Sequence, residues 1–227
     1  EESRAQYAAP ERVHVVGTPV REDFLYTRHA DARAALGLTD ERPLVVSYWG
    51  SLGAREMNKK ITRFFVREIE DGLPFRHIHA CGSFGWRWMP EYVREQGVDL
   101  AAQDAIEMRE YIYDMPQVMA AADLVICRAG AATIAEVMAS GTPCIMVPSP
   151  NVTDNHQEKN ARVLEARGAA EVIRECDCDG DVLYAAAKAI LSDPARQKRM
   201  KAAAQEMAVV DSAERIYETV LRLAKAR

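Results

Sequence analysis

The chain has 227 residues, of which 48% are hydrophobic and 28% charged, and its formal net charge is −5. This composition is typical of a globular protein with a substantial core, and the negative charge argues against a general nucleic-acid binder. No apolar run approaches the ~20 residues that span a bilayer, and no signal peptide is visible. The five cysteines show no disulfide framework, and Cys81, Cys127 and Cys144 lie in or beside apolar segments. We therefore expect reduced core cysteines and a cytoplasmic protein.

The first twenty residues contain a predicted strand that has no partner. Residues 13–16 are mostly apolar and are followed by Gly17-Thr18-Pro19, which stops the strand. Nothing before them supplies a sheet, and residue 1 is not Met, so we expect the end of another domain here. A short helix is expected at 31–36, closed by Gly37.

From residue 43 onward, predicted strands and helices alternate. Apolar runs predict six strands, at 44–48, 75–80, 105–111, 124–127, 144–147 and 170–173. Helices are expected at 54–70, 91–96, 115–121, 133–141 and 156–166, and three more at 179–191, 194–207 and 212–226. This order indicates an α/β fold with a doubly wound, parallel sheet of about six strands and right-handed crossovers. Such sheets bind ligands at the carboxyl ends of their strands.

The stretch 123–136 carries the clearest sign of a ligand site. An apolar strand ends at Cys127, a turn of small residues follows Arg128, and a helix is expected to open at Thr133. The unpaired N–H groups and the dipole of a helix N-terminus attract anions, which predicts the phosphates of a nucleotide. Thr133-x-x-Glu136 also matches a capping box, which composition alone favours. The alternative places Thr133 on a phosphate and Glu136 on the hydroxyls of a ribose.

Two other turns after strands have less specific patterns. The turn 50–53, Gly-Ser-Leu-Gly, lacks the full dinucleotide fingerprint, which disfavours an NAD site. Ser51 fits either a phosphate ligand or a helix N-cap, and the sequence leaves both open. Gln157 and Asn160 share one helix face, where amides can bind sugar hydroxyls, although a merely polar helix start has the same pattern.

No metal site is predicted from the sequence. His77-x-His79 places two rings on one face of a strand but lacks a third ligand. The segment 176–179, Cys-Asp-Cys-Asp, lacks partners at a metal-binding spacing, so we interpret it as a solvated turn. The loop 84–89 is unusually aromatic, and a membrane or a partner domain are possible contacts for it. Packing on the adjacent helix is the interpretation that we favour.

Four motifs together resemble the C-terminal domain of the MurG family, the UDP-N-acetylglucosamine:undecaprenyl-pyrophosphoryl-N-acetylmuramyl-pentapeptide N-acetylglucosaminyltransferases. They are GTPVR (17–21), GSLGAR (50–55), YIYDMPQVMAAADLVICRAGAATIAEVMASGTP (111–143) and PSPNVTDNHQEKNAR (148–162). The resemblance implies one half of a two-domain GT-B-type glycosyltransferase with Rossmann-like domains. Residues 1–21 would be the end of the N-terminal domain and the linker, 22–210 the sugar-nucleotide-binding domain, and 211–227 a helix that packs on the missing domain.

The resemblance also implies roles for individual residues. Arg21 would approach the donor from the linker, Ser51 would bind the pyrophosphate or sugar, and Ile112 would offer its backbone to the uracil edge. Ala131, Ala132 and Thr133 would line the pyrophosphate and sugar. Glu136 would hold the ribose hydroxyls, and Gln157 would read the N-acetylglucosamine hydroxyls. Two departures from the family pattern are Trp49, where Gly is usual, and Thr18, where Asn is usual.

The implied reaction is inverting transfer of N-acetylglucosamine from its UDP donor to the muramyl C4 hydroxyl of a lipid-linked acceptor, without metal or cofactor. The catalytic base is expected in the missing domain, so no catalytic residue is assigned here and the isolated fragment is expected to be inactive. The implied location is the cytoplasmic face of the bacterial plasma membrane, with membrane contact through the full-length protein. The alternatives are another UDP-sugar glycosyltransferase, an epimerase of the same fold, or a UDP-binding module without turnover.

Overall fold

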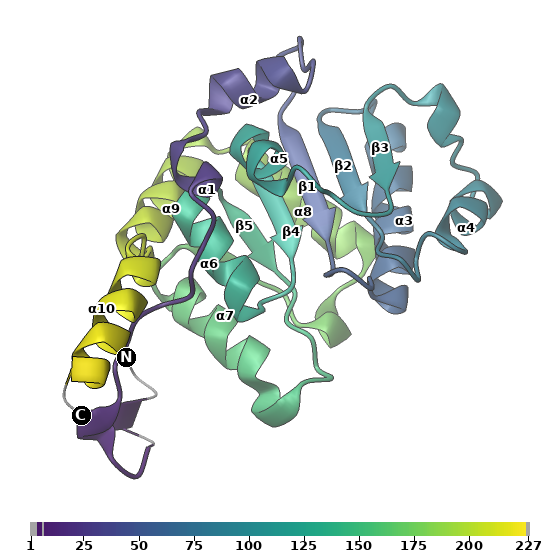
Figure 1. The fold of residues 1–227 in the computed structure, drawn as a ribbon. Helices are drawn as coiled ribbons and strands as arrows, with labels where there is room; N and C mark the ends of the chain where they lie inside the picture. The colour runs from purple at the N-terminus through teal and green to yellow at the C-terminus, as the bar shows by residue number, and fades with distance from the viewer. Residues whose placement is uncertain (1–3, 6, 226–227) are drawn as a thin grey trace.

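The structure, a computed structural model, describes residues 4–5 and 7–225. Six parallel strands form one sheet in the order β3-β2-β1-β4-β5-β6 (Figure 1). They are β1 (Leu44–Tyr48), β2 (Arg76–Ala80), β3 (Ile106–Arg109), β4 (Leu124–Cys127), β5 (Cys144–Met146) and β6 (Ala170–Val172). The chain runs outward from β1 to β3, returns to the other side of β1 as β4, and runs outward again to β6. The predicted doubly wound α/β fold is thereby confirmed.

Helices cover both faces of this sheet because its central strands are apolar on both sides. Along β1, Val46 and Tyr48 face one core cluster, whereas Val45 and the following Trp49 face the other. Figure 1 shows α5 and α6 in front of the sheet and α8 behind it. The helices are α1 (Asp23–Tyr26), α2 (His29–Ala35), α3 (Arg55–Glu70), α4 (Met89–Glu95), α5 (Met115–Ala121), α6 (Ala131–Ser140), α7 (His156–Ala166), α8 (Gly180–Leu191), α9 (Pro194–Met207) and α10 (Ser212–Lys225). The structure also contains the 3-10 turns η2 (Pro10–Arg12), η3 (Leu100–Ala102), η4 (Thr153–Asn155) and η5 (Glu175–Asp177).

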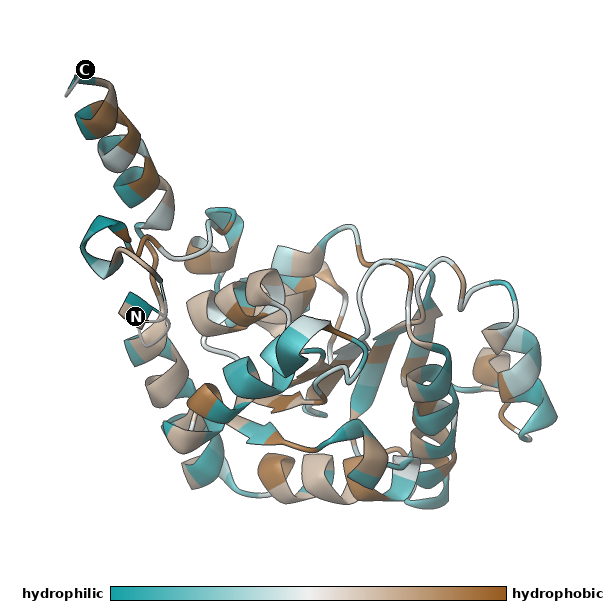
Figure 2. Ribbon diagram, turned by 90° about the horizontal axis from the view of Figure 1, so that it is seen from below, coloured by the Kyte–Doolittle hydropathy of each residue, from teal (hydrophilic) through white to brown (hydrophobic). Residues whose placement is uncertain are grey.

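The predicted strand at 13–16 is wrong. These residues are extended but belong to no strand, because none of the described strands lies beside them. They lie beside the C-terminal helix α10, where the Nη2 atom of Arg222 is 3.2 Å from each ring nitrogen of His14. Figure 2 shows α10 projecting away from the body that holds the sheet, with the N-terminal segment near its base.

The solvated turn predicted at 176–179 is also partly wrong. Asp177 pairs with Arg174 at the surface, and the Asp179 carboxylate accepts the Val182 amide at the start of α8. Cys178, however, is buried in the core cluster behind the sheet. The predicted burial of Cys81, Cys127 and Cys144 as free thiols is confirmed.

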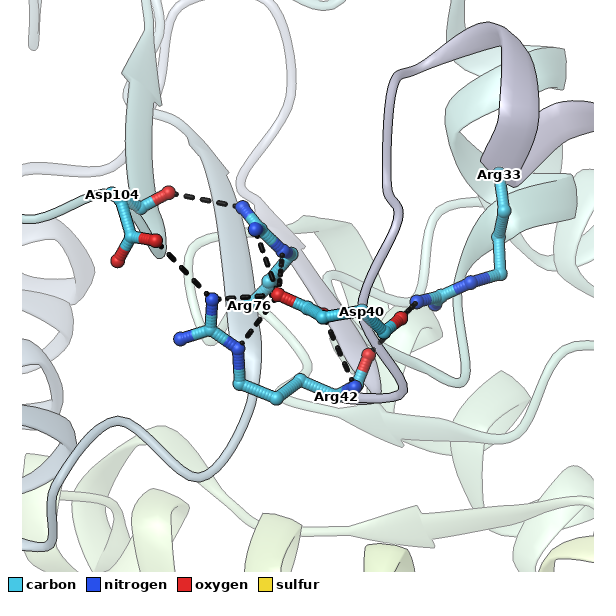
Figure 3. A network of polar contacts seen from close by, with 5 residues as sticks. All are labelled: Arg33, Asp40, Arg42, Arg76 and Asp104. Carbon is cyan, nitrogen blue, oxygen red and sulfur yellow. Dashed lines mark hydrogen bonds and ion pairs between the residues drawn. The ribbon is translucent and has the colours of Figure 1, made fainter.

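A network of ion pairs lies at the amino edge of the sheet, where β1, β2 and β3 begin (Figure 3). The Asp40 carboxylate accepts from Arg42 at 2.7 Å and from Arg76 at 2.9 Å. These two guanidinium groups hold the pKa of Asp40 well below its usual range. Arg33 donates to the main-chain oxygens of Asp40 and Arg42, so the segment entering β1 is fixed from both sides.

In the described part of the chain, no helix is both long and apolar enough to cross a bilayer.

Candidate donor site at the carboxyl edge

The strand order reverses between β1 and β4, so the loops that leave these two strands diverge and open a crevice between them. The loop after β1 contains Ser51, and the loop after β4 leads into α6. Six of the eight residues assigned by resemblance lie on these two connections or on the loop after β5 and α7. The topology therefore brings together most of the predicted site.

Helix α6 begins two residues earlier than predicted. Its N-cap is Gly130, which has extended backbone angles, and no side chain caps the helix. Thr133 is the third helical residue, so its hydroxyl cannot occupy the cap position. The capping-box interpretation of Thr133 and Glu136 is therefore wrong, because neither side chain caps α6.

The amides at the start of α6 are available to a ligand. Within the residues described, the N–H groups of Ala131, Ala132 and Thr133 form no hydrogen bond, and Ala131 and Ala132 are exposed. The helix has ten residues, so its dipole adds partial positive charge at this end. This combination suits a phosphate.

Glu136 lies one turn into α6, and its side chain is half-buried. Burial raises the pKa of Glu136, while the charge of Arg21 acts in the opposite direction. The Arg21 guanidinium packs 5.4 Å from the Phe24 ring centroid. The linker thus delivers a cation to the carboxylate that resemblance assigns to the ribose.

Gln157 connects the loops after β4 and β5. Its Oε1 accepts the Ala129 amide at 3.3 Å and the Ser149 amide at 2.9 Å. These bonds explain why the extended segment continues to Gly130 before α6 begins. The side-chain NH₂ group of Gln157 has no partner among the described residues and remains a donor for a ligand.

Arg128 also connects the loops after β4 and β5. One of its amino groups donates to the main-chain oxygens of Val147 and Pro148 and pairs with Glu175 at 2.6 Å. Its guanidinium lies 5.8 Å from the Trp49 ring centroid. Trp49, the departure from the family pattern, is buried in the core and so does not crowd the turn that follows it.

The loop after β1 is packed backbone against backbone. Gly53 has a φ of +78°, and a Cβ there would lie 2.0 Å from the Cys81 carbonyl oxygen. Helix α3 begins only at Arg55, with Ala54 as its N-cap. Ser51 is therefore not an N-cap, and its exposed side chain stands at the edge of the crevice.

Ile112 follows β3, and its side chain is buried in the same cluster as Tyr48 and Val137. In the described residues, its N–H and C=O form no hydrogen bond. An open cavity of about 480 Å³ lies beside it, lined by Arg21, Tyr113 and Gln117 among others. This loop can therefore present one donor and one acceptor.

The two histidines of β2 belong to a buried hydrogen-bonded chain. His77 Nδ1 lies 3.0 Å from Glu68, and its Nε2 lies 2.7 Å from the Ser47 hydroxyl, which lies 2.7 Å from His79 Nδ1. All four residues are fully buried. Burial lowers the pKa of His77 to about 3 and raises that of Glu68. Nowhere in the described residues do three His, Cys, Asp or Glu side chains gather at a metal-binding distance.

Comparison with known proteins agrees with this geometry. The profile of the glycosyltransferase family 28 C-terminal domain matches residues 45–216. The chain belongs to this family. A UDP-N-acetylglucosamine--N-acetylmuramyl-(pentapeptide) pyrophosphoryl-undecaprenol N-acetylglucosamine transferase of Caldanaerobacter subterraneus is 38% identical over 97% of the chain. The chain spans 59% of that relative's length.

Solved structures show the same fold. The crystal structure of Acinetobacter baumannii MurG matches with a TM-score of 0.72 and 25% identity, over 90% of this chain and 57% of that one. A putative UDP-N-acetylglucosamine 2-epimerase from Listeria monocytogenes matches with a TM-score of 0.67 over 98% of this chain and 56% of that one. Its 16% identity supports a shared fold alone. The resemblance to MurG is thus confirmed at the level of family and fold.

Proposed function

We propose that this chain is the donor-binding half of an inverting N-acetylglucosaminyltransferase that uses UDP-N-acetylglucosamine and a lipid-linked muramyl-pentapeptide acceptor. The observation that carries the proposal is the uncapped N-terminus of α6 at the switch point, with Glu136 one turn behind it. It combines a helix N-terminus that can bind a diphosphate with a carboxylate that can accept from ribose hydroxyls. The family membership and the name of the 38% identical relative favour this activity over the alternatives.

Different residues would bind different parts of the donor. The amides of Ala131, Ala132 and Thr133 would bind the pyrophosphate. Glu136 would accept from the ribose hydroxyls, and the free N–H and C=O of Ile112 would pair with the uracil edge. This leaves the sugar for the loops after β1 and β5.

Three further groups would surround the sugar and the pyrophosphate. The NH₂ group of Gln157 can donate to an N-acetylglucosamine hydroxyl while its oxygen holds the loops. Ser51 would reach the pyrophosphate or sugar from the opposite side of the crevice, and Arg21 would approach from the linker.

In the proposed reaction, the acceptor C4 oxygen attacks the anomeric carbon, and the bond from that carbon to the UDP oxygen breaks with inversion. The acceptor gives up its proton to a general base, and UDP leaves with the electron pair. Donors preorganised around the pyrophosphate stabilise the charge that develops on it. A helix terminus contributes ~0.3–1 kcal/mol per anion contact, so several donors must act together. We assign the base to a domain outside this chain.

We propose the same division of the chain as the sequence implied. Residues 1–21 would join the two domains, 22–210 would bind the donor, and 211–227 would return to the other domain. The exposed apolar side chains of Tyr217, Val220 and Leu223 on α10 support this last contact. The full-length protein would act at the cytoplasmic face of the plasma membrane.

Transfer of labelled N-acetylglucosamine to a lipid-linked acceptor by the full-length protein tests the proposal. Labelled glycolipid is expected from the full-length protein, and none from this chain alone. An epimerase would instead change the UDP-sugar without needing the acceptor, and that result would replace the proposed activity.

A further inference from the structure

Tyr48 ends strand β1 directly beside the donor crevice. It lies opposite Cys127, the last residue of β4, so its side chain stands where the two strands diverge. The ring packs in the core cluster on the side of the sheet that α6 covers, together with Val137 and Ile112 (Figure 1). Only 7% of the residue is exposed, so a ligand in the crevice would not touch the phenol directly.

The Tyr48 hydroxyl has no hydrogen-bond partner within the described residues, and its oxygen is shielded from solvent. Buried tyrosines usually satisfy this group, because an unpaired buried hydroxyl destabilises the fold. Tyr184 shows the usual arrangement: it is also buried, and its hydroxyl donates to the Asp71 carboxylate. The Tyr48 hydroxyl is thus a donor that the fold itself does not use.

Two residues of the donor site on one face of α6, Thr133 and Glu136, lie close to this hydroxyl. Burial raises the pKa of Tyr48 well above its usual value, and the Cys127 thiol and the Glu136 carboxylate raise it further. The Thr133 hydroxyl acts in the opposite direction but does not reach hydrogen-bonding geometry. Tyr48 therefore stays protonated, with a carboxylate near its O–H group.

Glu136 lacks hydrogen-bond donors in the part of the chain that the structure describes. Its side chain is half-buried, and burial raises its pKa, so its charged form needs donors to persist. The Arg21 charge opposes this shift, but Glu136 forms no hydrogen bond or ion pair with a described residue. An ionised carboxylate offers about four acceptor positions, so it can accept from both ribose hydroxyls and from a tyrosine at once.

We propose that Tyr48 is a positioning residue for the donor: when Glu136 accepts from the ribose hydroxyls, the Tyr48 hydroxyl donates to the same carboxylate and fixes its direction. The inference rests on the proposed function, in which Glu136 binds the ribose. Because the core holds the phenol in place, only the Glu136 side chain has to turn, and little conformational entropy is lost. Tyr48 thereby favours nucleotides that carry the ribose hydroxyls over those that lack them.

Tyr48→Phe removes the hydroxyl and keeps the ring, so it should separate binding from stability. UDP affinity should fall about 10-fold, the lower end of the range for a hydrogen bond to a charged group. The melting temperature should stay the same or rise, because the variant no longer buries an unpaired hydroxyl. Calorimetric titration and thermal unfolding of the 227-residue chain measure the two effects.

Tyr184→Phe is the matched control, because it removes a buried hydroxyl that does have a partner, in the core cluster behind the sheet. It should lower the melting temperature and leave UDP affinity unchanged. If Tyr48→Phe behaves like this control, the Tyr48 hydroxyl is only structural and the proposal is wrong.

Two further titrations show whether Tyr48 acts through Glu136. Dideoxy-UDP lacks both ribose hydroxyls, so the parent chain and Tyr48→Phe should bind it equally well. In a Glu136→Ala background, Tyr48→Phe should cause no further loss of UDP affinity. A loss that is equal for UDP and dideoxy-UDP, or one that persists in the Glu136→Ala background, would overturn the proposal.

The parent chain and Glu136→Ala separate this inference from the proposed function. UDP binding that weakens in Glu136→Ala but not in Tyr48→Phe would overturn the role of Tyr48 alone. A folded parent chain that binds no UDP would overturn the proposed function and the role of Tyr48 with it.

Discussion

The two edges of the sheet use charge in opposite ways. At the amino edge, Arg42 and Arg76 donate to the Asp40 carboxylate (Figure 3). The Asp123 carboxylate accepts the Leu44 amide at 2.8 Å. At the carboxyl edge, the first amides of α6 have no partner within the described residues. The amino edge therefore uses its polar groups to hold the fold, and the carboxyl edge leaves them for a ligand. Substitutions at the two edges should separate stability from binding.

The largest expected effect on stability is at the amino edge. Asp40→Ala removes the shared acceptor of two half-buried guanidinium groups and should lower the free energy of unfolding by about 2 kcal/mol, since hydrogen bonds to a charged group contribute about 1.5–3 kcal/mol. Urea denaturation measures this. Asp104→Ala is the matched control, because that carboxylate is largely exposed and its contact to Arg42 is 3.4 Å long; it should change stability by less than about 1 kcal/mol. Both variants, Asp40→Ala and Asp104→Ala, should bind UDP as tightly as the parent chain does, because neither residue lies at the carboxyl edge.

The converse substitution is Glu136→Ala at the carboxyl edge. It should weaken UDP binding by about 1.5–3 kcal/mol, the range for a hydrogen bond to a charged group. The melting temperature should stay nearly unchanged, because Glu136 does not cap its helix. A lower melting temperature with unaltered UDP affinity would contradict the assigned role.

The buried hydrogen-bonded side chains that include Glu68, His77 and His79 predict a pH optimum for the stability of the fold. Between pH ~4.5 and ~6.5, unfolded His77 and His79 bind protons that the folded chain excludes, while folded Glu68 keeps one that the unfolded chain loses. The two histidines therefore make stability rise with pH up to ~6.5, and Glu68 opposes this rise because its folded pKa is raised. Above ~6.5 only the Glu68 proton counts, so stability should fall again.

Urea denaturation at several pH values measures this optimum. Glu68→Gln should retain the rise below pH ~6.5 and lose the fall above it. An equally steep fall in Glu68→Gln would show that other groups cause it.

Gln157 offers a smaller and more specific test. Gln157→Ala removes the acceptor for two backbone amides and the proposed sugar donor, so it should cost about 1–2 kcal/mol in stability and also weaken sugar-nucleotide binding. Gln157→Glu keeps the acceptor and loses the NH₂ group. It should retain stability and UDP affinity while losing the preference for UDP-N-acetylglucosamine over UDP. If Gln157→Glu keeps that preference, the residue only joins the loops.

The sheet was predictable because its strands are continuous apolar runs, and α5, α7 and α9 have the bounds expected from their sequence. Helices α2, α4 and α6 each begin two residues earlier than predicted, and the sequence left open whether Ser51 caps α3. The start of α6 depends on the bond from Ala129 to Gln157, 28 residues away, and the start of α3 depends on the close contact of Gly53 with Cys81. The strand expected at 13–16 failed because an apolar run forms a strand only beside a partner.

The residues around the site were harder to identify than those on it. The pairing of Arg128 with Glu175 and the packing of Trp49 join segments that no local motif connects. A turn of glycines or other small residues after an apolar strand can be identified from the sequence alone. The side chains that brace such a turn come from other strands, and their positions follow from the sheet order.

The central claim is that the carboxyl edge between β1 and β4 binds a uridine sugar nucleotide. Calorimetric titration of UDP-N-acetylglucosamine into this chain tests it most directly, with UDP as the positive comparison and NAD as the negative one. The account predicts saturable binding of both uridine nucleotides to the parent chain, weaker binding to Glu136→Ala, and none of NAD. A folded chain that binds no uridine nucleotide, or binds NAD equally well, would contradict it.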